Sequence, residues 1–139
     1  MRDVLDDALE YIAGGQQVAV AMVVDSKRSA PRPLGSRLLV TADGEMRGSV
    51  SGGCVESDVV LRAQEVLRTG TPALVPYGIT DDDAFDVGLP CGGEIEVFIS
   101  PLDPDEVRRI ADAVQKEERL SVRTVLTGEH AGEIKNLDA

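Results

Sequence analysis

The residues best suited to chemistry in this sequence are two cysteines, each beside a pair of glycines. Cys54 follows Gly52 and Gly53 and opens a segment with helical spacing. Glycine allows positive φ and a close approach of backbone to a ligand. The N–H groups at a helix N-terminus favour an anion, and a thiol there is biased towards the nucleophilic, metal-binding thiolate. The alternative is a tight turn above a small, buried and inert thiol.

The second cysteine, Cys91, precedes Gly92 and Gly93 and a segment of strand character. Two cysteines set against glycine pairs predict one pocket with two thiols, provided that the two loops converge. A structural zinc site needs four ligands. His130 is the only histidine and there is no third cysteine, so we expect no structural zinc. Thiols more than about 7 Å apart at Cα form no disulfide without backbone movement.

A cationic stretch is the third feature. Residues 26–42 contain no acidic residue in a chain of net charge -11. Its cations are Lys27, Arg28, Arg32 and Arg37. Arginine offers a rigid fork that suits phosphate, and the prolines at 31 and 33 stiffen the segment. We interpret it as an anion-binding loop, with Arg32 and Arg37 shaping the pocket. The alternative is a solvated loop that balances nearby carboxylates.

Carboxylates supply two further candidates. An acidic cluster is formed by Asp81, Asp82, Asp83 and Asp86. Such oxygens suit a hard cation such as magnesium, although a run of aspartates is more often simply solvated. Glu56, two residues after Cys54, is a candidate general base; alternatively it only complements the helix dipole.

The elements that must position these residues follow from apolar spacing. Helical periodicity predicts helices over residues 3–13, 55–68 and 105–116. Short apolar or alternating runs predict strands over 17–24, 37–41, 46–50, 73–77, 94–100 and 121–127. This irregular alternation with a hairpin predicts an α/β fold, a mixed sheet with flanking helices in a single compact domain. The last strand has little after it to pack against, so a further hairpin or a homodimer remains open.

Composition excludes several classes of function. The net charge of -11 repels a nucleic-acid backbone, and two Tyr, two Phe and no Trp leave no platform for stacking bases. The N-terminal segment is acidic where a signal peptide is basic, and no uncharged apolar run approaches the ~20 residues that span a bilayer. We therefore expect a cytoplasmic protein that binds neither nucleic acid nor membrane.

Two long motifs resemble the XdhC/CoxI family. They are SAPRPLGSRLLVTADGEMRGSVSGGCVE, residues 29–56, and YGITDDDAFDVGLPCGGEIEVFISP, residues 77–101. The resemblance implies an accessory protein that binds molybdenum cofactor and assists its sulfuration and insertion into a xanthine- or carbon monoxide dehydrogenase. That cofactor is a pterin with a dithiolene and a phosphate. The implied binding residues are Cys54 and Cys91.

The resemblance also sets the expected domain and partners. It corresponds to the family's N-terminal domain over residues 1–139; longer members add a Rossmann-like domain, and no G-x-G-x-x-G motif follows a strand here. We expect a maturation factor without turnover of its own. Its expected partners are a molybdenum hydroxylase and, as a further candidate, a cysteine desulfurase. The alternatives are a thiol oxidoreductase or sulfur-transfer enzyme that uses Cys54 and Cys91, and an interaction module whose glycine loops are structural.

Overall fold

The chain folds around a five-stranded sheet with the strand order β3-β2-β1-β5-β4. A computed structural model describes residues 4–27, 32–53, 55–78, 94–116 and 122–136. The sheet strands are β1 (Val18–Lys27), β2 (Arg37–Thr41), β3 (Met46–Gly48), β4 (Ala73–Tyr77) and β5 (Glu94–Pro101). The helices are α1 (Leu5–Ala13), α2 (Glu56–Thr69) and α3 (Pro104–Gln115), and β6 (Val122–Thr124) pairs with β7 (Ile134–Asn136).

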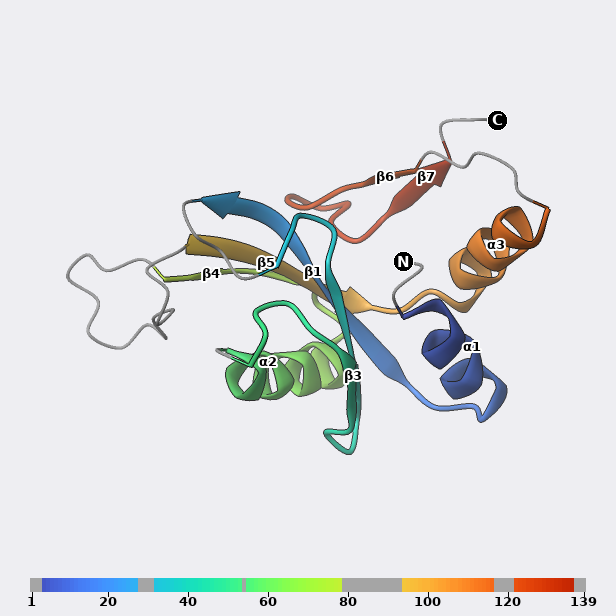
Figure 1. Ribbon diagram of the computed structural model, residues 1–139, viewed down its shortest axis with the longest axis horizontal. Coiled ribbons are helices and arrows are strands. Elements are labelled where there is room, and N and C mark those ends of the chain that lie inside the picture. Colours follow the sequence, from blue (N-terminus) through green and yellow to red (C-terminus); the bar gives the residue numbers. More distant parts are fainter. Residues whose placement is uncertain (1–3, 28–31, 54, 79–93, 117–121, 137–139) are drawn as a thin grey trace.

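Helices cover both faces of the sheet. α2 lies on one face, while α1 and α3 lie side by side on the other (Figure 1). Successive side chains of a strand point to opposite faces. Because helices cover both faces here, the strands carry apolar side chains on both sides. On β2, for example, Leu38 and Val40 join the cluster that contains α2, whereas Leu39 joins the cluster that contains α1 and α3. Both clusters are therefore needed to bury one strand.

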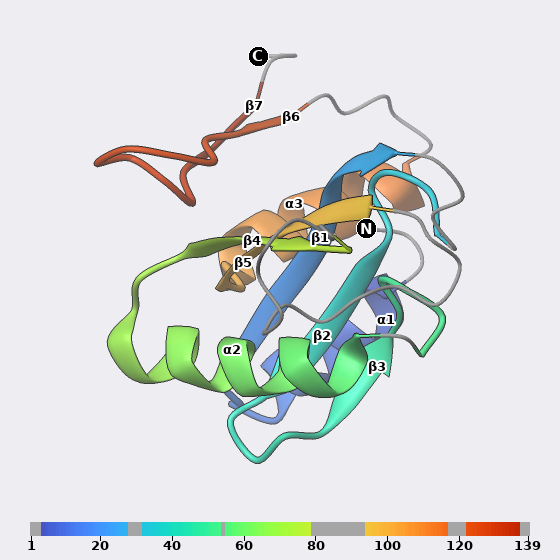
Figure 2. The same ribbon diagram turned by 90° about the vertical axis from the view of Figure 1, so that its left-hand side faces the viewer.

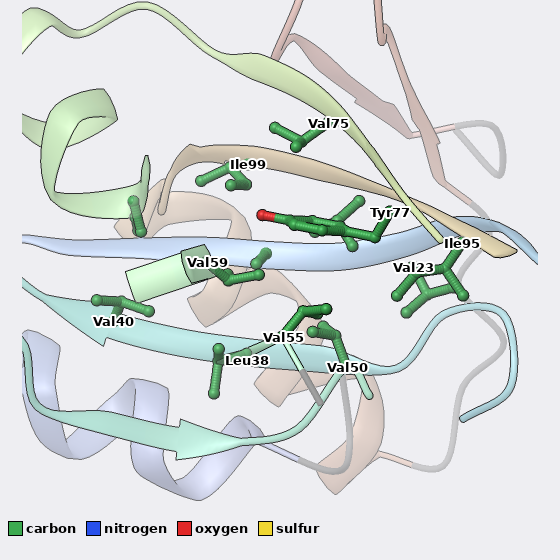
Figure 3. Packing of buried hydrophobic residues seen from close by; sticks show 14 of the residues in the cluster. Val23, Leu38, Val40, Val50, Val55, Val59, Val75, Tyr77, Ile95 and Ile99 are labelled. Atoms are coloured by element: carbon green, nitrogen blue, oxygen red, sulfur yellow. The ribbon is translucent and has the colours of Figure 1, made fainter. Parts of the chain in front are cut away.

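The core beneath α2 holds the start of that helix in place. Val50 and Val55, which flank the Gly52–Gly53 pair, are 0% and 1% exposed and belong to the same cluster as Val59 of α2. Figure 3 shows these side chains packed together with Tyr77 and residues of β1, β2 and β5. The loop that enters α2 is thus anchored by an apolar residue on each side of the glycines.

Local signals fix the ends of two helices. The side chain of Asp103 accepts a hydrogen bond from the N–H of Asp105 at 2.9 Å, which caps α3 just before Pro104. α2 ends at Gly70, which adopts the left-handed conformation with φ 75°. Among the helices that the structure describes, none combines the length and the apolar character needed to cross a bilayer.

The predicted fold class, a single α/β domain with helices flanking a sheet, is confirmed. Each predicted helix and strand has a counterpart, with ends that differ by a few residues. All described pairings in the main sheet are antiparallel, so the parallel pair that a mixed sheet would include is not among them. The segment expected to form the last strand pairs with β7 in a hairpin.

Candidate functional site

The strand register brings the ends of β1, β4 and β5 together. Lys27, the last residue of β1, pairs with Glu94, the first residue of β5. Tyr77, the last residue of β4, pairs with Ile95. The segment between β4 and β5 therefore begins and ends beside the segment that leaves β1.

The same end of the sheet receives the entrance to α2. Gly48, the last residue of β3, pairs with Leu38 next to the start of β2. Three segments consequently depart from one end of the sheet: 28–36, 49–55 and 78–93. This end lies on the left in Figure 1 and faces the viewer in Figure 2. These segments carry Arg32 and both cysteine–glycine motifs.

The second segment, residues 49–55, is called the SGGC loop below, and the carboxylate of Glu56 lies at its centre. One oxygen, Oε2, accepts the N–H groups of Val50 and Ser51, each at 3.0 Å, and the hydroxyl of Ser49 at 2.8 Å. The other, Oε1, accepts the N–H of Gly53 at 2.9 Å and the hydroxyl of Ser51. Glu56 is only 6% exposed. Its two oxygens thus accept five hydrogen bonds from the loop.

The two serines extend this network to the remaining backbone. Ser49 Oγ accepts the N–H of Gly52 at 2.8 Å, and Ser51 Oγ accepts the N–H of Val55 at 2.9 Å. Each hydroxyl donates to Glu56 and accepts from the backbone. Every N–H group that the structure describes between residues 50 and 55 therefore has an acceptor, either Glu56 or one of the two serine hydroxyls.

The network keeps Glu56 ionised. Burial alone raises the pKa of a carboxyl group, but the hydrogen bonds from Ser51, Ser49 and Val50 outweigh it and lower the pKa of Glu56 from 4.5 to about 2. A general base needs an open lone pair and a pKa near neutrality, and Glu56 has neither. The general-base interpretation is therefore wrong, because Glu56 organises the loop.

Glycines at three positions permit this backbone path. Gly52 and Gly53 have φ of 72° and 111°, a region that favours glycine. Gly48 has φ of 94°, and a Cβ built there would lie 2.4 Å from the carbonyl oxygen of Arg37. The next N–H, from Ser49, donates to that same oxygen at 3.1 Å. Gly48 thus lets the SGGC loop start in direct contact with β2.

A second contact ties α2 to β4. Tyr77 is 1% exposed, and its hydroxyl donates to Asp58 Oδ2 at 2.6 Å. The same oxygen accepts Arg62 Nε at 2.9 Å. Burial and the neighbouring carboxylate raise the pKa of Tyr77, which stays protonated as a donor. The first turn of α2 is thereby fixed beside the start of the segment 78–93.

The two predicted arginines lie in different surroundings. The Nε of Arg32 is buried, and no residue in the described ranges accepts a hydrogen bond from it. Arg37 donates to the carbonyl oxygen of Gly35 at 2.9 Å. Its side chain lines a cavity of about 50 Å³ on the α3 side of the sheet, together with Phe98 and Glu106. The Arg37 side chain thus lies on the face opposite α2, although its backbone touches the SGGC loop.

The remaining predicted site residues lie outside the described residues. They are Cys54, Cys91, Gly92, Gly93 and the acidic cluster Asp81, Asp82, Asp83 and Asp86. The residues on both sides of position 54 are nevertheless fixed, Gly53 through its N–H and Val55 through its N–H and its buried side chain.

Sequence reasoning missed the role of Glu56 within the loop and the contact of Tyr77 with Asp58. The capping-box pattern gave no signal for Glu56, because Val55 is the N-cap and Glu56 is the first residue of α2, not the third. Its hydrogen bond to the N–H of Gly53 reaches back beyond the cap. Nothing in the local sequence around Tyr77 indicates its partner, which lies 19 residues away.

Several known proteins are similar to this chain in sequence. Residues 11–78 match the family described as the XdhC and CoxI family. The molybdenum cofactor insertion chaperone PaoD of Escherichia coli is 36% identical over 101 residues, which is 73% of this chain and 31% of that protein. A probable xanthine dehydrogenase subunit of Bacillus subtilis is 30% identical over 95 residues, which is 67% of this chain and 29% of that protein. The chain thus spans about a third of these relatives' length.

A solved structure shares the fold. The crystal structure of a xanthine dehydrogenase from Bacillus halodurans superposes with a TM-score of 0.77 and 23% sequence identity. The match covers 96% of this chain and 41% of that one. The arrangement of helices around the antiparallel sheet therefore occurs within a larger protein.

Proposed function

Because this chain belongs, through residues 11–78, to the XdhC and CoxI family, we propose that it takes part in the maturation of a molybdenum hydroxylase. In this role it binds the molybdenum cofactor and passes it on without turnover of its own. The finer steps belong to the same proposal: assistance in sulfuration with a cysteine desulfurase, insertion into a xanthine- or carbon monoxide dehydrogenase, and a cytoplasmic location. A homodimer is compatible with it.

The observation that carries the proposal is the departure of three segments from one end of the sheet. The segments 28–36, 49–55 and 78–93 contain the cationic stretch and both cysteine–glycine motifs. Antiparallel pairing places the ends of β1, β4 and β5 next to one another, and the start of β2 and the end of β3 lie towards the same end of the sheet. Residues that lie far apart in sequence are thereby available to a single ligand.

Different side chains at this end of the sheet match the two parts of the cofactor. The cofactor supplies a soft metal–sulfur centre and a phosphate. Thiolates bind soft metals, so Cys54 and Cys91 are the proposed ligands of the metal–sulfur end. The proposal assigns the phosphate to the cationic stretch, because the buried Nε of Arg32 lacks an acceptor among the described residues. The N–H groups of Val50, Ser51 and Gly53 do not suit a phosphate, because they already have acceptors.

The glycine pairs have a positioning role in the proposal. Gly52 and Gly53 hold the SGGC loop in a conformation that other residues rarely adopt, and a Cβ at Gly53 would meet open space. Substitution there is therefore a test of backbone conformation and not of crowding. Gly92 and Gly93 have the corresponding role beside Cys91 in the proposal.

Binding of molybdenum cofactor to the purified chain under anaerobic conditions tests the proposal. We expect binding by the wild type, and loss of at least tenfold in affinity, about 1.4 kcal/mol, in Cys54→Ala, Cys91→Ala and Arg32→Ala. Arg68→Ala is the matched control, since Arg68 is exposed at the far end of α2 and pairs only with Glu65 among the described residues.

Two results would contradict the proposal. The first is a folded wild-type chain that binds no cofactor. The second is unchanged binding by both cysteine variants. A cysteine pair that instead cycles between disulfide and thiol forms in the presence of a dithiol, without cofactor binding, would support the thiol oxidoreductase alternative.

A further inference from the structure

Glu56 is held without a cationic partner. No basic side chain within the described ranges forms an ion pair with it, although it is 6% exposed. Its charge is balanced by the N–H dipoles of Val50, Ser51 and Gly53 and by two hydroxyls. Buried charges are costly unless paired or fully hydrogen-bonded. The hydrogen bonds from the loop therefore take the place of a cationic partner for the carboxylate.

The donors converge as they do in protein sites for anions. Successive backbone N–H groups that point into one concavity bind anionic groups in many proteins. Here the N–H groups of Val50, Ser51 and Gly53 point into one concavity, and a carboxylate from the same chain fills it. The loop conformation depends on that carboxylate, because the five hydrogen bonds link its beginning, its middle and its end.

We propose that Glu56 is a positioning residue that fills the anion-binding concavity of the SGGC loop, fixing the loop around position 54 and closing it to external oxyanions. The inference rests on the proposed function in one respect only, namely that the SGGC loop does not bind the phosphate of the cofactor. The geometry of the loop carries the rest.

Chemical rescue of Glu56→Ala tests the proposal. This variant empties the concavity while leaving the donors in the chain. We expect sodium formate or acetate to stabilise it, with chloride at equal ionic strength as the reference. A ligand at 100 times its Kd raises the apparent folding equilibrium constant by about 100-fold. The wild type, whose concavity is filled, and Glu65→Ala, from the exposed face of α2, are expected to show no difference between formate and chloride.

A readout at position 54 separates positioning from general stability. The rate of alkylation of Cys54 by iodoacetamide, resolved from that of Cys91 by peptide mass spectrometry, is measured at a temperature where every variant is folded. We expect Glu56→Ala to change the Cys54 rate by at least about tenfold and formate to return it to within about twofold of wild type. These factors correspond to about 1.4 and 0.4 kcal/mol. The Cys91 rate is the internal reference.

Two results would overturn the proposal, and neither involves the cofactor. One is a folded Glu56→Ala variant that responds identically to formate and chloride. Should that variant not fold, the wild type provides the second test by hydrogen exchange: the amides of Val50, Ser51 and Gly53, which share one carboxylate as acceptor, are expected to be protected together. Independent behaviour of these amides would overturn the proposal. Failure of cofactor binding with successful rescue would contradict only the proposed function.

Discussion

Glu56→Gln is the most informative single substitution, because it preserves shape and removes only charge and one acceptor. If the amide oxygen takes the place of Oε2, the donors Ser49, Val50 and Ser51 keep an acceptor, but each bond becomes neutral. The amide NH₂ then faces the N–H of Gly53, which loses its acceptor, and the Ser51 hydroxyl, which turns to accept from the amide instead of donating. The opposite orientation of the amide leaves three donors without an acceptor, so it is less favourable.

The expected cost follows from these five changes. Hydrogen bonds to charged groups contribute about 1.5–3 kcal/mol and neutral ones about 0.5–1.5. Three weakened bonds, one reversed bond and one lost bond, partly replaced by water at the exposed Gly53, give a loss of roughly 2–4 kcal/mol in the free energy of unfolding. The same hydrogen bonds lower the pKa of Glu56 from 4.5 to about 2, which corresponds to at most about 3 kcal/mol.

The pH dependence gives this prediction its sign. A carboxyl whose pKa is lowered in the folded state contributes stability above its unfolded pKa and loses that contribution as pH falls through its folded pKa. The difference in unfolding free energy between wild type and Glu56→Gln is therefore expected to be constant above pH 4.5 and to shrink towards pH 2. Other carboxylates titrate in both proteins, so they cancel from the difference.

Urea unfolding followed by circular dichroism from pH 2 to 7 measures this difference. In thermal unfolding at pH 7 we expect Tm to fall by roughly 10 °C in Glu56→Gln and by no more than about 2 °C in the control Glu65→Gln. Glu65 lies on the same helix, where its exposed carboxylate pairs with Arg68. A Glu56→Gln protein as stable as the control, or a difference that does not change with pH, would refute the assignment of Glu56 as the centre of the loop.

Further predictions concern contacts that hold the site in place. Gly48→Ala is expected to cost at least about 3 kcal/mol, because its Cβ would meet the Arg37 carbonyl. At Gly70, where φ is also positive but nothing lies within 4 Å, alanine should cost only about 1 kcal/mol. Tyr77→Phe removes the bond to Asp58 and should cost about 1.5–2 kcal/mol. Thermal unfolding of the four proteins distinguishes these values; equal losses at both glycines would contradict the close approach.

Local patterns predicted the elements, and longer-range contacts decided the site. The strand over Arg37–Thr41, for example, follows from an apolar run of strand length. The Glu56 network depends on a loop that turns back on itself. The glycine pair indicated positive φ in this loop, but the sequence did not indicate which group would fill the concavity. The contact between Tyr77 and Asp58 joins a strand to a helix. No local pattern specifies such a pair, because it is set by packing.

Arg37 illustrates the limit of composition. Its place in an acid-free stretch suggested a single cationic loop, but it is the first residue of β2 and the alternation of the strand decides its side. Its side chain lies with Phe98 and Glu106, whereas its carbonyl oxygen meets Ser49. Composition alone treats Arg32 and Arg37 as equivalent. The alternation of β2 places the Arg37 side chain on the α3 side of the sheet, so the two residues have different surroundings.

The saturated SGGC loop also bears on how a ligand would be divided over this end of the sheet. The described N–H groups of this loop already have acceptors, so the proposed contribution of the loop is the thiol of Cys54. Arg32 contributes a cationic group for the phosphate. Charge-based binding weakens as salt screens it, while metal–thiolate bonds are insensitive to screening. Cofactor affinity of Cys54→Ala should therefore keep the salt dependence of the wild type, and that of Arg32→Ala should lose part of it. Identical salt dependence in all three proteins would mean that Arg32 does not bind the phosphate.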